Sequence, residues 1–455
     1  MTFRDRIGPF NRWIEPLLAL AVTGAFSWAL IHLYLYNYLT QPYFFVPEDS
    51  YMDWVNTAHY AHNPGAYDSW GTIYPPLSFV VLKFLTNGTC YTTAEWYSSR
   101  SCDWYGLLML HTIYFVNIVL IAKTFIKCDR STVLPRTIAL SIGYPMTFAL
   151  ERGNILLLCF TCILLAYGPL VRSTRLRWLA AAFAVNFKVY LVGTLFAQLL
   201  RRRWRWFEGA LVTSVIVYLI SFALLGGHGT PKEIYDNIVL FGELTAAGNP
   251  LDLWNPVTYN PAILLLKSPF PVPNVIGSRA TDILTIVLPL AIHVTQATIL
   301  LAAAAAWLRP EAITTQRVVF LALAITLVSS EAGSYTQIFL ILFVFMEKWQ
   351  GFARKWAIVG CYILCIPHDF ISISNMPAVA TAGFLGKQEI IADYSIGIMP
   401  LVRPGIVLSI AIAMSCATIH DVWAYIRQNG WRERWRYRHA HSSAADDSRA
   451  APTAA

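Results

Sequence analysis

Charge is scarce in this sequence of 455 residues: only 13% of them are charged, whereas 56% are hydrophobic. The charges stand in clusters, and the uncharged stretches between clusters are about as long as a segment that crosses a bilayer. This pattern indicates a polytopic, all-α membrane protein. The first apolar run, Ile14 to Tyr38, also lacks a small-residue cleavage site and is too long for the core of a signal peptide. A cleavable signal is therefore not expected, and the run is predicted to be the first transmembrane helix.

Other signals are missing as well. No cluster of His, Cys or carboxylate residues has the spacing of metal ligands, so neither a metal nor another cofactor is predicted. No internal repeat of matched helices is visible, which argues against a transporter. The basic clusters Arg201–Arg205 and Arg432–Arg438 are explained by attachment to an anionic leaflet, so the predicted partners include membrane lipids and no nucleic acid.

The apolar runs predict about twelve transmembrane helices in a single integral membrane domain, residues 1–438, followed by a disordered cytoplasmic tail, 439–455. The expected spans are 14–38, 105–124, 135–150, 154–170, 177–188, 189–200, 207–226, 282–307, 317–331, 335–348, 356–373 and 402–426.

The distribution of basic residues predicts an orientation. If both termini are cytoplasmic, 25 of the 34 Lys and Arg residues fall on the inner side and 9 on the outer side. The positive-inside rule favours this arrangement, and we expect the protein in the cell (inner) membrane with its site on the periplasmic or extracellular side.

Three outer segments, about 39–104, 227–281 and 374–401, are too long to be simple turns, and loops of this length usually carry a site. The first contains Cys90 and Cys102, the only cysteines placed outside. A disulfide between them suits an oxidising compartment, although the sequence gives no distance between the two.

The first outer segment begins with "PEDSYMDW", residues 47–54, in which acids directly follow the first span. If 49–60 is helical, Asp49 and Asp53 lie one turn apart on one face, and the apolar positions suit an interfacial helix on the bilayer. The alternatives are a solvated loop acid or a helix N-cap formed by Asp49 or Ser50.

Three cations are expected at outer helix ends: Arg152, Lys188 and Arg403. Snorkelling to the interface, or a pair with a nearby carboxylate, explains each of them singly. Three at a similar depth favour a ligand instead. A lipid phosphate fits, because it needs fixed cations where water is scarce.

Further motifs follow in the first outer segment. Gly65, Tyr67 and Asp68 form a Gly-x-Tyr-Asp motif, and Tyr74 to Leu77 read Tyr-Pro-Pro-Leu. Paired prolines end one element and start the next, and the apolar stretch after them is too short to span. We expect a re-entrant or interfacial segment.

Together, the order of these motifs resembles glycosyltransferase family 87 of the GT-C superfamily, whose members include polyprenol-phosphate-mannose-dependent mannosyltransferases. The resemblance covers about residues 45–210: an aspartate after the first span, Gly-x-Tyr-Asp, Tyr-Pro-Pro-Leu, Arg-Gly-Asn (Arg152 to Asn154), and Lys188 ahead of an Arg-rich inner loop.

The resemblance implies a GT-C-type glycosyltransferase fold and a hexosyltransferase that uses a polyprenyl-phosphate sugar as donor and a lipid or glycan as acceptor. Asp49 is then the catalytic general base of an inverting displacement, with Asp53 in reserve. Lys188, Arg152 and Arg403 bind the donor phosphate. Some GT-C enzymes use a divalent ion.

The chain departs from the family near the outer end of a late helix, where the family often has Ser-Pro and a histidine and this chain has "SSEAGSYTQ", residues 329–337. Glu331, Tyr335 or Gln337 are candidates to replace the histidine, and His368-Asp369 is another. With Tyr74, residues Glu331, Tyr335 and His368 complete the predicted substrate-binding set.

Two alternatives stay open. A surface-polysaccharide polymerase or ligase would have its essential arginines in late outer loops. A lipid or glycan transporter would have ionisable residues in the middle of its spans.

Overall fold

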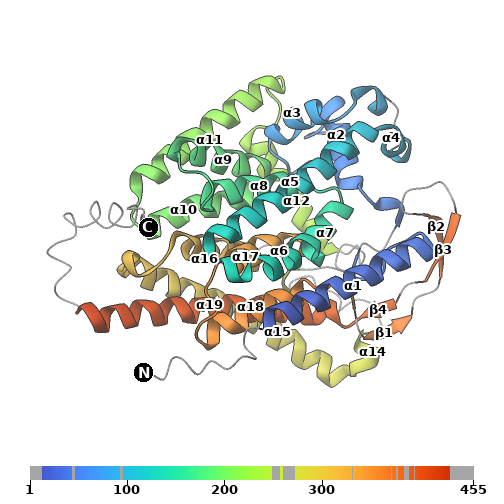
Figure 1. The fold of residues 1–455 in the computed structure, drawn as a ribbon. Coiled ribbons are helices and arrows are strands. Elements are labelled where there is room, and N and C mark those ends of the chain that lie inside the picture. The colour runs from blue at the N-terminus through green and yellow to red at the C-terminus, as the bar shows by residue number, and fades with distance from the viewer. Residues whose placement is uncertain are drawn as a thin grey trace.

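The computed structural model describes a helical bundle with two small two-stranded sheets at one end (Figure 1). Glu331 and the predicted tail, 439–455, lie outside the described residues. The described residues are 13–43, 47–92, 96–247, 257–259, 272–329, 332–369, 371–375, 378–383, 389–393 and 395–430.

The first half of the chain contains the segment 39–104, predicted to be outside and still called the first outer segment, together with the helices before and after it. Its α-helices are α1 (Ile14–Tyr36), α2 (Met52–His62), α3 (Pro76–Leu85), α4 (Trp96–Cys102), α5 (Trp104–Cys128), α6 (Val133–Ile142), α7 (Tyr144–Glu151), α8 (Leu156–Tyr167), α9 (Thr174–Phe187), α10 (Gly193–Leu200) and α11 (Trp204–Leu224). Short 3₁₀ turns precede α2 and α10: η2 (Pro47–Asp49) and η5 (Val189–Val192).

The second half contributes the central helices and the four strands. These elements are α12 (Pro231–Ala247), α14 (Val272–Ile276), α15 (Ser278–Leu308), α16 (Thr315–Ser329), the 3₁₀ turn η7 (Ser334–Thr336), α17 (Gln337–Phe345), α18 (Phe352–Leu364), β1 (Ser372–Asn375), β2 (Val379–Ala382), β3 (Glu389–Ala392), β4 (Ser395–Gly397) and α19 (Met399–Asn429). Strand β1 pairs with β4 and β2 with β3, both antiparallel.

Among the described residues, five helices are long and apolar enough to cross a membrane: α1, α5, α11, α15 and α19. They carry many exposed apolar side chains, such as Leu20, Leu219 and Ile286. Soluble monomers rarely expose apolar surface on this scale, so the five helices suggest a multi-pass membrane protein.

The prediction of about twelve spans is therefore wrong. Several expected spans are short helices inside the bundle. Every residue of α17 and most residues of α16 are buried by protein, including Phe320, Phe339 and Phe343. Apolar sequence in these segments builds a protein core, and hydropathy does not distinguish such a core from a lipid-facing surface.

Two expected helices also end early for local reasons. The span 135–150 breaks into α6 and α7 at Gly143, where a Cβ atom would lie 2.1 Å from the Ala139 carbonyl oxygen. The span 356–373 ends at Leu364, because Pro367 restrains the backbone of the residue before it and cannot donate a helical hydrogen bond.

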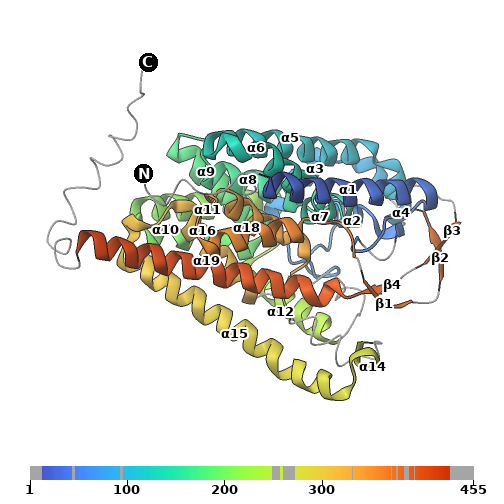
Figure 2. The same ribbon diagram turned by 60° about the horizontal axis from the view of Figure 1, so that its bottom comes forward.

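The bundle has two chemically different ends. Helix α16 begins and α19 ends at what we call the network end, whereas the opposite, site end carries α4, α14 and the four strands (Figure 2).

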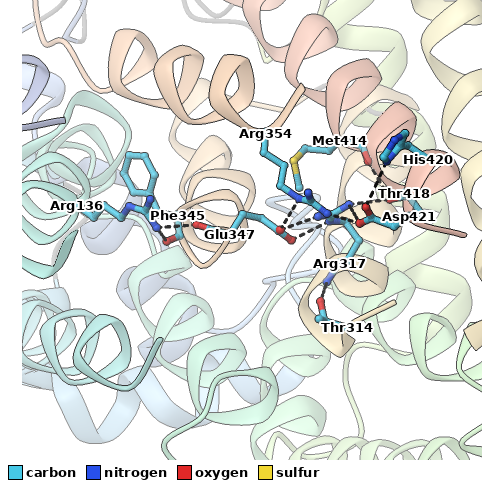
Figure 3. A network of polar contacts seen from close by, with 10 residues as sticks. All are labelled: Arg136, Thr314, Arg317, Phe345, Glu347, Arg354, Met414, Thr418, His420 and Asp421. Carbon is cyan, nitrogen blue, oxygen red and sulfur yellow. Dashed lines mark hydrogen bonds and ion pairs between the residues drawn. The ribbon is translucent and has the colours of Figure 1, made fainter. Parts of the chain in front are cut away.

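Ion pairs of buried and partly buried side chains join the helices at the network end, and Figure 3 shows those of Arg317 and Arg354. Arg136 of α6 donates to Glu15 of α1 at 2.7 Å. Arg317 of α16 contacts Glu347 at 2.6 Å and Asp421 of α19 at 3.7 Å, and Arg354 of α18 pairs with the same two carboxylates.

Candidate functional site

The first outer segment and the end of α7 meet through Arg152. Its guanidinium Nη1 donates to Asp49 Oδ2 at 2.8 Å and its Nη2 to Asp53 Oδ1 at 2.7 Å. Asn154 Nδ2 donates to the second oxygen of Asp53, Oδ2, at 2.7 Å. We call these four residues the Arg152 clamp. Two of the acids that follow the first span are thus brought to the Arg-Gly-Asn motif, about 100 residues further along the chain.

The backbone reinforces this contact. The Tyr51 amide donates to the Glu151 carbonyl at 2.7 Å, and the Asp53 amide to the Arg152 carbonyl at 3.0 Å. Gly153 has φ +66°, and a Cβ there would lie 2.9 Å from Trp54 Cβ and 3.0 Å from Tyr51 Cα. Glycine lets the two segments approach this closely.

The predicted helix over 49–60 is α2, but it begins only at Met52. Asp49 lies in η2, and Tyr51, with φ +65°, separates the two elements, so the aspartates do not share one helix. No side-chain N-cap by Asp49 or Ser50 is present. The apolar face of this helix was expected to lie on the bilayer, but it packs against protein instead, because Trp54, Val55 and Ala58 are buried.

The two aspartates differ in how fully their oxygens are used. Both oxygens of Asp53 accept hydrogen bonds. Among the described residues, Oδ1 of Asp49 has no partner, and the Asp49 side chain is 31% exposed against 18% for Asp53. Asp49 therefore has an oxygen that can accept a proton from a ligand.

Lys188 lies at the end of α9, and its Nζ is 4.2 Å from the ring centroid of Tyr74. No carboxylate of the described chain lies within ion-pair distance of this ammonium group. The ring supplies a cation–π contact but no negative charge. Lys188 is thus a half-buried cation available to an anion.

The Tyr-Pro-Pro-Leu motif positions Tyr74. The Tyr67 hydroxyl donates to the Tyr74 carbonyl at 2.8 Å, and Pro76 opens α3, which packs on α9. Burial raises the pKa of the Tyr74 hydroxyl above its ordinary value; Asp53 adds to the rise and Arg152 opposes it. The hydroxyl is therefore neutral, and it lies close enough to the Arg152 clamp to feel its charges.

Tyr335 of η7 closes the cluster from the second half of the chain. Lys188, Asp53, Tyr74 and Arg152 all act electrostatically on its hydroxyl. Of the predicted set, Asp49, Asp53, Arg152, Lys188, Tyr74 and Tyr335 therefore gather in one region at the site end. Asp68 of the Gly-x-Tyr-Asp motif is exposed.

Arg403 takes a different position. It is buried, its Nη2 lies 2.8 Å from Asp369 Oδ1, and its guanidinium stacks on Tyr144 at 4.6 Å. The carbonyl of His368 is 3.4 Å from the same Nη2. Burial lowers the pKa of the His368 side chain. Since Asp369 already balances Arg403, these residues form a structural ion pair beside the cluster.

Arg152 also differs from its predicted role, because it pairs with carboxylates of the protein, whereas it was expected to bind the donor phosphate. Burial alone would lower its pKa, but Asp53, Asp49 and Glu151 raise it above the ordinary value. Its charge is committed to these carboxylates. Lys188 is the better placed of the two cations for a phosphate.

Sequence reasoning missed Glu151, a buried carboxyl whose Oε1 accepts a hydrogen bond from Ser50 Oγ at 3.0 Å. Its position next to Arg152 in an apolar run was the available signal. It also missed Tyr190, whose buried hydroxyl lies near Tyr74 and Tyr335 and has no hydrogen-bond partner among the described residues.

Two further observations complete the description. Cys90 and Cys102 form a disulfide with a Cα–Cα distance of 5.6 Å, which confirms that pairing. Within the described part of the chain, no group of three His, Cys, Asp or Glu side chains could hold a metal ion.

Comparisons of the chain with protein-family models, with curated proteins and with solved structures found no match.

Proposed function

We propose that the protein is a membrane glycosyltransferase that moves a mannose-like hexose from a polyprenyl-phosphate donor to a hydroxyl of a lipid or glycan acceptor. The observation that carries the proposal is one cluster at one end of a membrane bundle, in which Arg152 and Lys188 both act on the Tyr335 hydroxyl. Among the described residues, Asp49 on Arg152 has one open carboxylate oxygen, and Lys188 on Tyr74 has no carboxylate partner. The motif order that resembles glycosyltransferase family 87 supports the same reaction.

In the proposed reaction, Asp49 Oδ1 takes the proton of the acceptor hydroxyl while the hydroxyl oxygen attacks the anomeric carbon. The bond from this carbon to the phosphate oxygen breaks, its electron pair stays on the phosphate, and the configuration inverts. The leaving phosphate gains negative charge, which Lys188 stabilises without a proton donor. Arg152 and Asn154 hold Asp53 and Asp49 in place.

The proposal puts this chemistry on the outer face of the cell (inner) membrane, with both termini cytoplasmic. The positive-inside bias supports that orientation, and so does the disulfide in the first outer segment, because disulfides persist in oxidising compartments.

The two alternatives have less support. A polymerase or ligase would use arginines of late outer loops, but Arg403 is neutralised by Asp369. A transporter would carry ionisable groups in the middle of its spans, whereas the ion pairs described above lie at the two ends of the bundle.

The test measures turnover of a panel of polyprenyl-phosphate sugars by purified protein in lipid nanodiscs, with release of polyprenyl phosphate followed by mass spectrometry. Lys188→Met keeps the aliphatic stem on Tyr74 but removes the charge. A lost charge-assisted contact should weaken donor binding by roughly tenfold to a hundredfold.

Lys83→Met is the matched control, because Lys83 is an exposed lysine of the same outer segment. Its donor affinity should equal that of the wild type. Release of no polyprenyl phosphate from any donor would refute the proposed reaction, and an unchanged donor affinity in Lys188→Met would refute the phosphate role.

A further inference from the structure

Glu151 lies directly behind the Arg152 clamp. Its Oε1 accepts a hydrogen bond from the Ser50 hydroxyl, and its backbone carbonyl accepts one from the Tyr51 amide, so Glu151 holds two of the three residues that separate Asp49 from Asp53. Arg100 Nη1 donates to the Ser50 carbonyl at 3.0 Å and fixes this turn from the other side. Through these contacts Glu151 determines where Asp49 stands, without itself contacting the open oxygen of Asp49.

The carboxyl of Glu151 is buried and incompletely satisfied. The residue is 5% exposed, and its Oε2 is buried with no hydrogen-bond partner among the described residues. A buried carboxylate with an unused oxygen is costly, whereas a neutral carboxyl is much less so.

We propose that Glu151 is a positioning residue of this site: it holds the Asp49–Ser50 turn on the end of α7, and its protonation sets the net charge that a bound phosphate meets. The inference rests on the proposed function for the identity of the phosphate, but not for the behaviour of Glu151 itself.

The titration of Glu151 falls in the physiological range. Burial raises its pKa to about 7; Arg152 and Ser50 oppose the rise, and Asp53 and Asp49 add to it. The groups around it are Arg152 from its own segment, Tyr43, Asp49, Tyr51 and Asp53 from the first outer segment, and Arg100 of α4 on the far side of Ser50.

Protonation changes the balance around Arg152. Below the pKa of Glu151, Asp49 and Asp53 share the guanidinium, whereas above it a third carboxylate is added. The extra negative charge repels a phosphate bound at Lys188. Donor affinity should therefore fall by about tenfold from about pH 6 to about pH 8.

The experiment has two independent measurements on the full-length protein in nanodiscs. Infrared difference spectra between acid and neutral pH follow the carbonyl stretch of a protonated carboxyl in the wild type and in Glu151→Gln. Binding of a short-chain polyprenyl phosphomannose is measured over the same range; this phosphodiester keeps a constant charge, so its own titration does not contribute.

We expect a carboxyl band that titrates near pH 7 in the wild type and is missing in Glu151→Gln, and a donor affinity that depends on pH only in the wild type. Ser50→Ala, which removes the hydrogen bond to Oε1, should raise the midpoint of the band, so the idea stays testable if Glu151→Gln folds poorly.

Absence of a band that depends on Glu151 would overturn the inference, and so would a pH dependence of binding that survives in Glu151→Gln. A band with the expected behaviour, in a protein that binds no donor at any pH, would refute the proposed donor while retaining the titration of Glu151.

Discussion

Replacement of the two aspartates separately gives the sharpest test of the site, because their surroundings predict different failures. In Asp49→Asn, the amide oxygen can still accept from Arg152 Nη1, as Asp49 Oδ2 does now at 2.8 Å. The amide nitrogen then occupies the open position. The fold and donor binding are retained, but the proton acceptor is lost.

The expected loss of rate follows from the role of a general base. A positioned base contributes about 10² to 10⁴ in rate, or about 3 to 5 kcal/mol of barrier. Turnover of Asp49→Asn should fall by this factor with an unchanged thermal midpoint.

Asp53→Asn should fail differently. Both oxygens of Asp53 accept hydrogen bonds, from Arg152 Nη2 and Asn154 Nδ2. An amide nitrogen in either position faces a donor, and one buried contact is lost at a cost of about 1–3 kcal/mol. This variant should unfold more easily, and its turnover should fall less than that of Asp49→Asn.

The assay follows transfer of a labelled sugar from polyprenyl phosphate to the lipid and glycan fractions of membranes that carry each variant, together with thermal unfolding of the purified protein. If Asp53→Asn is inactive and Asp49→Asn is active, the two roles are exchanged. If both variants turn over near the wild-type rate, the single-base reaction is wrong for this segment.

Two more predictions concern stability and orientation. Arg317→Met leaves Arg354 as the remaining cation for Glu347 and Asp421 and should cost about 1–3 kcal/mol of unfolding free energy, whereas Lys232→Met, which breaks an exposed pair, should leave the unfolding midpoint unchanged; equal midpoints for the two variants would contradict the structural role of the network. A cysteine placed at the exposed Ser69 should react with a membrane-impermeant reagent in intact cells, and labelling only after lysis would invert the proposed orientation.

Some of this arrangement could be predicted from the sequence because it follows from helix ends. The first apolar run was expected over 14–38 and α1 is Ile14–Tyr36. A charged residue just beyond a helix end must lie near that end of the bundle. Asp49, Arg152 and Lys188 were therefore expected at the same end of the bundle, and Asp49 contacts Arg152 while Lys188 contacts Tyr74 in the same cluster.

The pairings themselves could not be predicted. Nothing in the spacing of Arg152 and Asp49 shows that the cation of one motif neutralises the acid of another, because that contact depends on the close approach at Gly153. The same holds for Arg403 and its partner Asp369. The predicted span 356–373 placed Asp369 inside a helix, whereas α18 ends at Leu364, before Pro367.

The number of spans failed for a different reason. Segments such as α17 are as apolar as a lipid-facing helix, but they are only 9 residues long and are buried by neighbouring helices. Helix length distinguishes a buried core helix from a membrane-spanning helix only when the helix ends are known. Gly143 ends α6 and Pro367 limits α18, but a hydropathy average over a window does not detect such single residues.

The contrast between the two ends of the bundle argues for where the function lies. At the network end, each of three arginines forms an ion pair with a carboxylate, as expected of residues with a structural role: Arg136, Arg317 and Arg354. At the site end Arg403 and Arg152 also pair with carboxylates, but within the described part of the chain Lys188 has no carboxylate partner and Oδ1 of Asp49 has no donor. In a chain with so few charges, such a cation and such a carboxylate oxygen gain no ion pair or hydrogen bond from the described part of the protein. They are the groups that a phosphate and a hydroxyl would satisfy, and for this reason the proposed reaction assigns its two central roles to them.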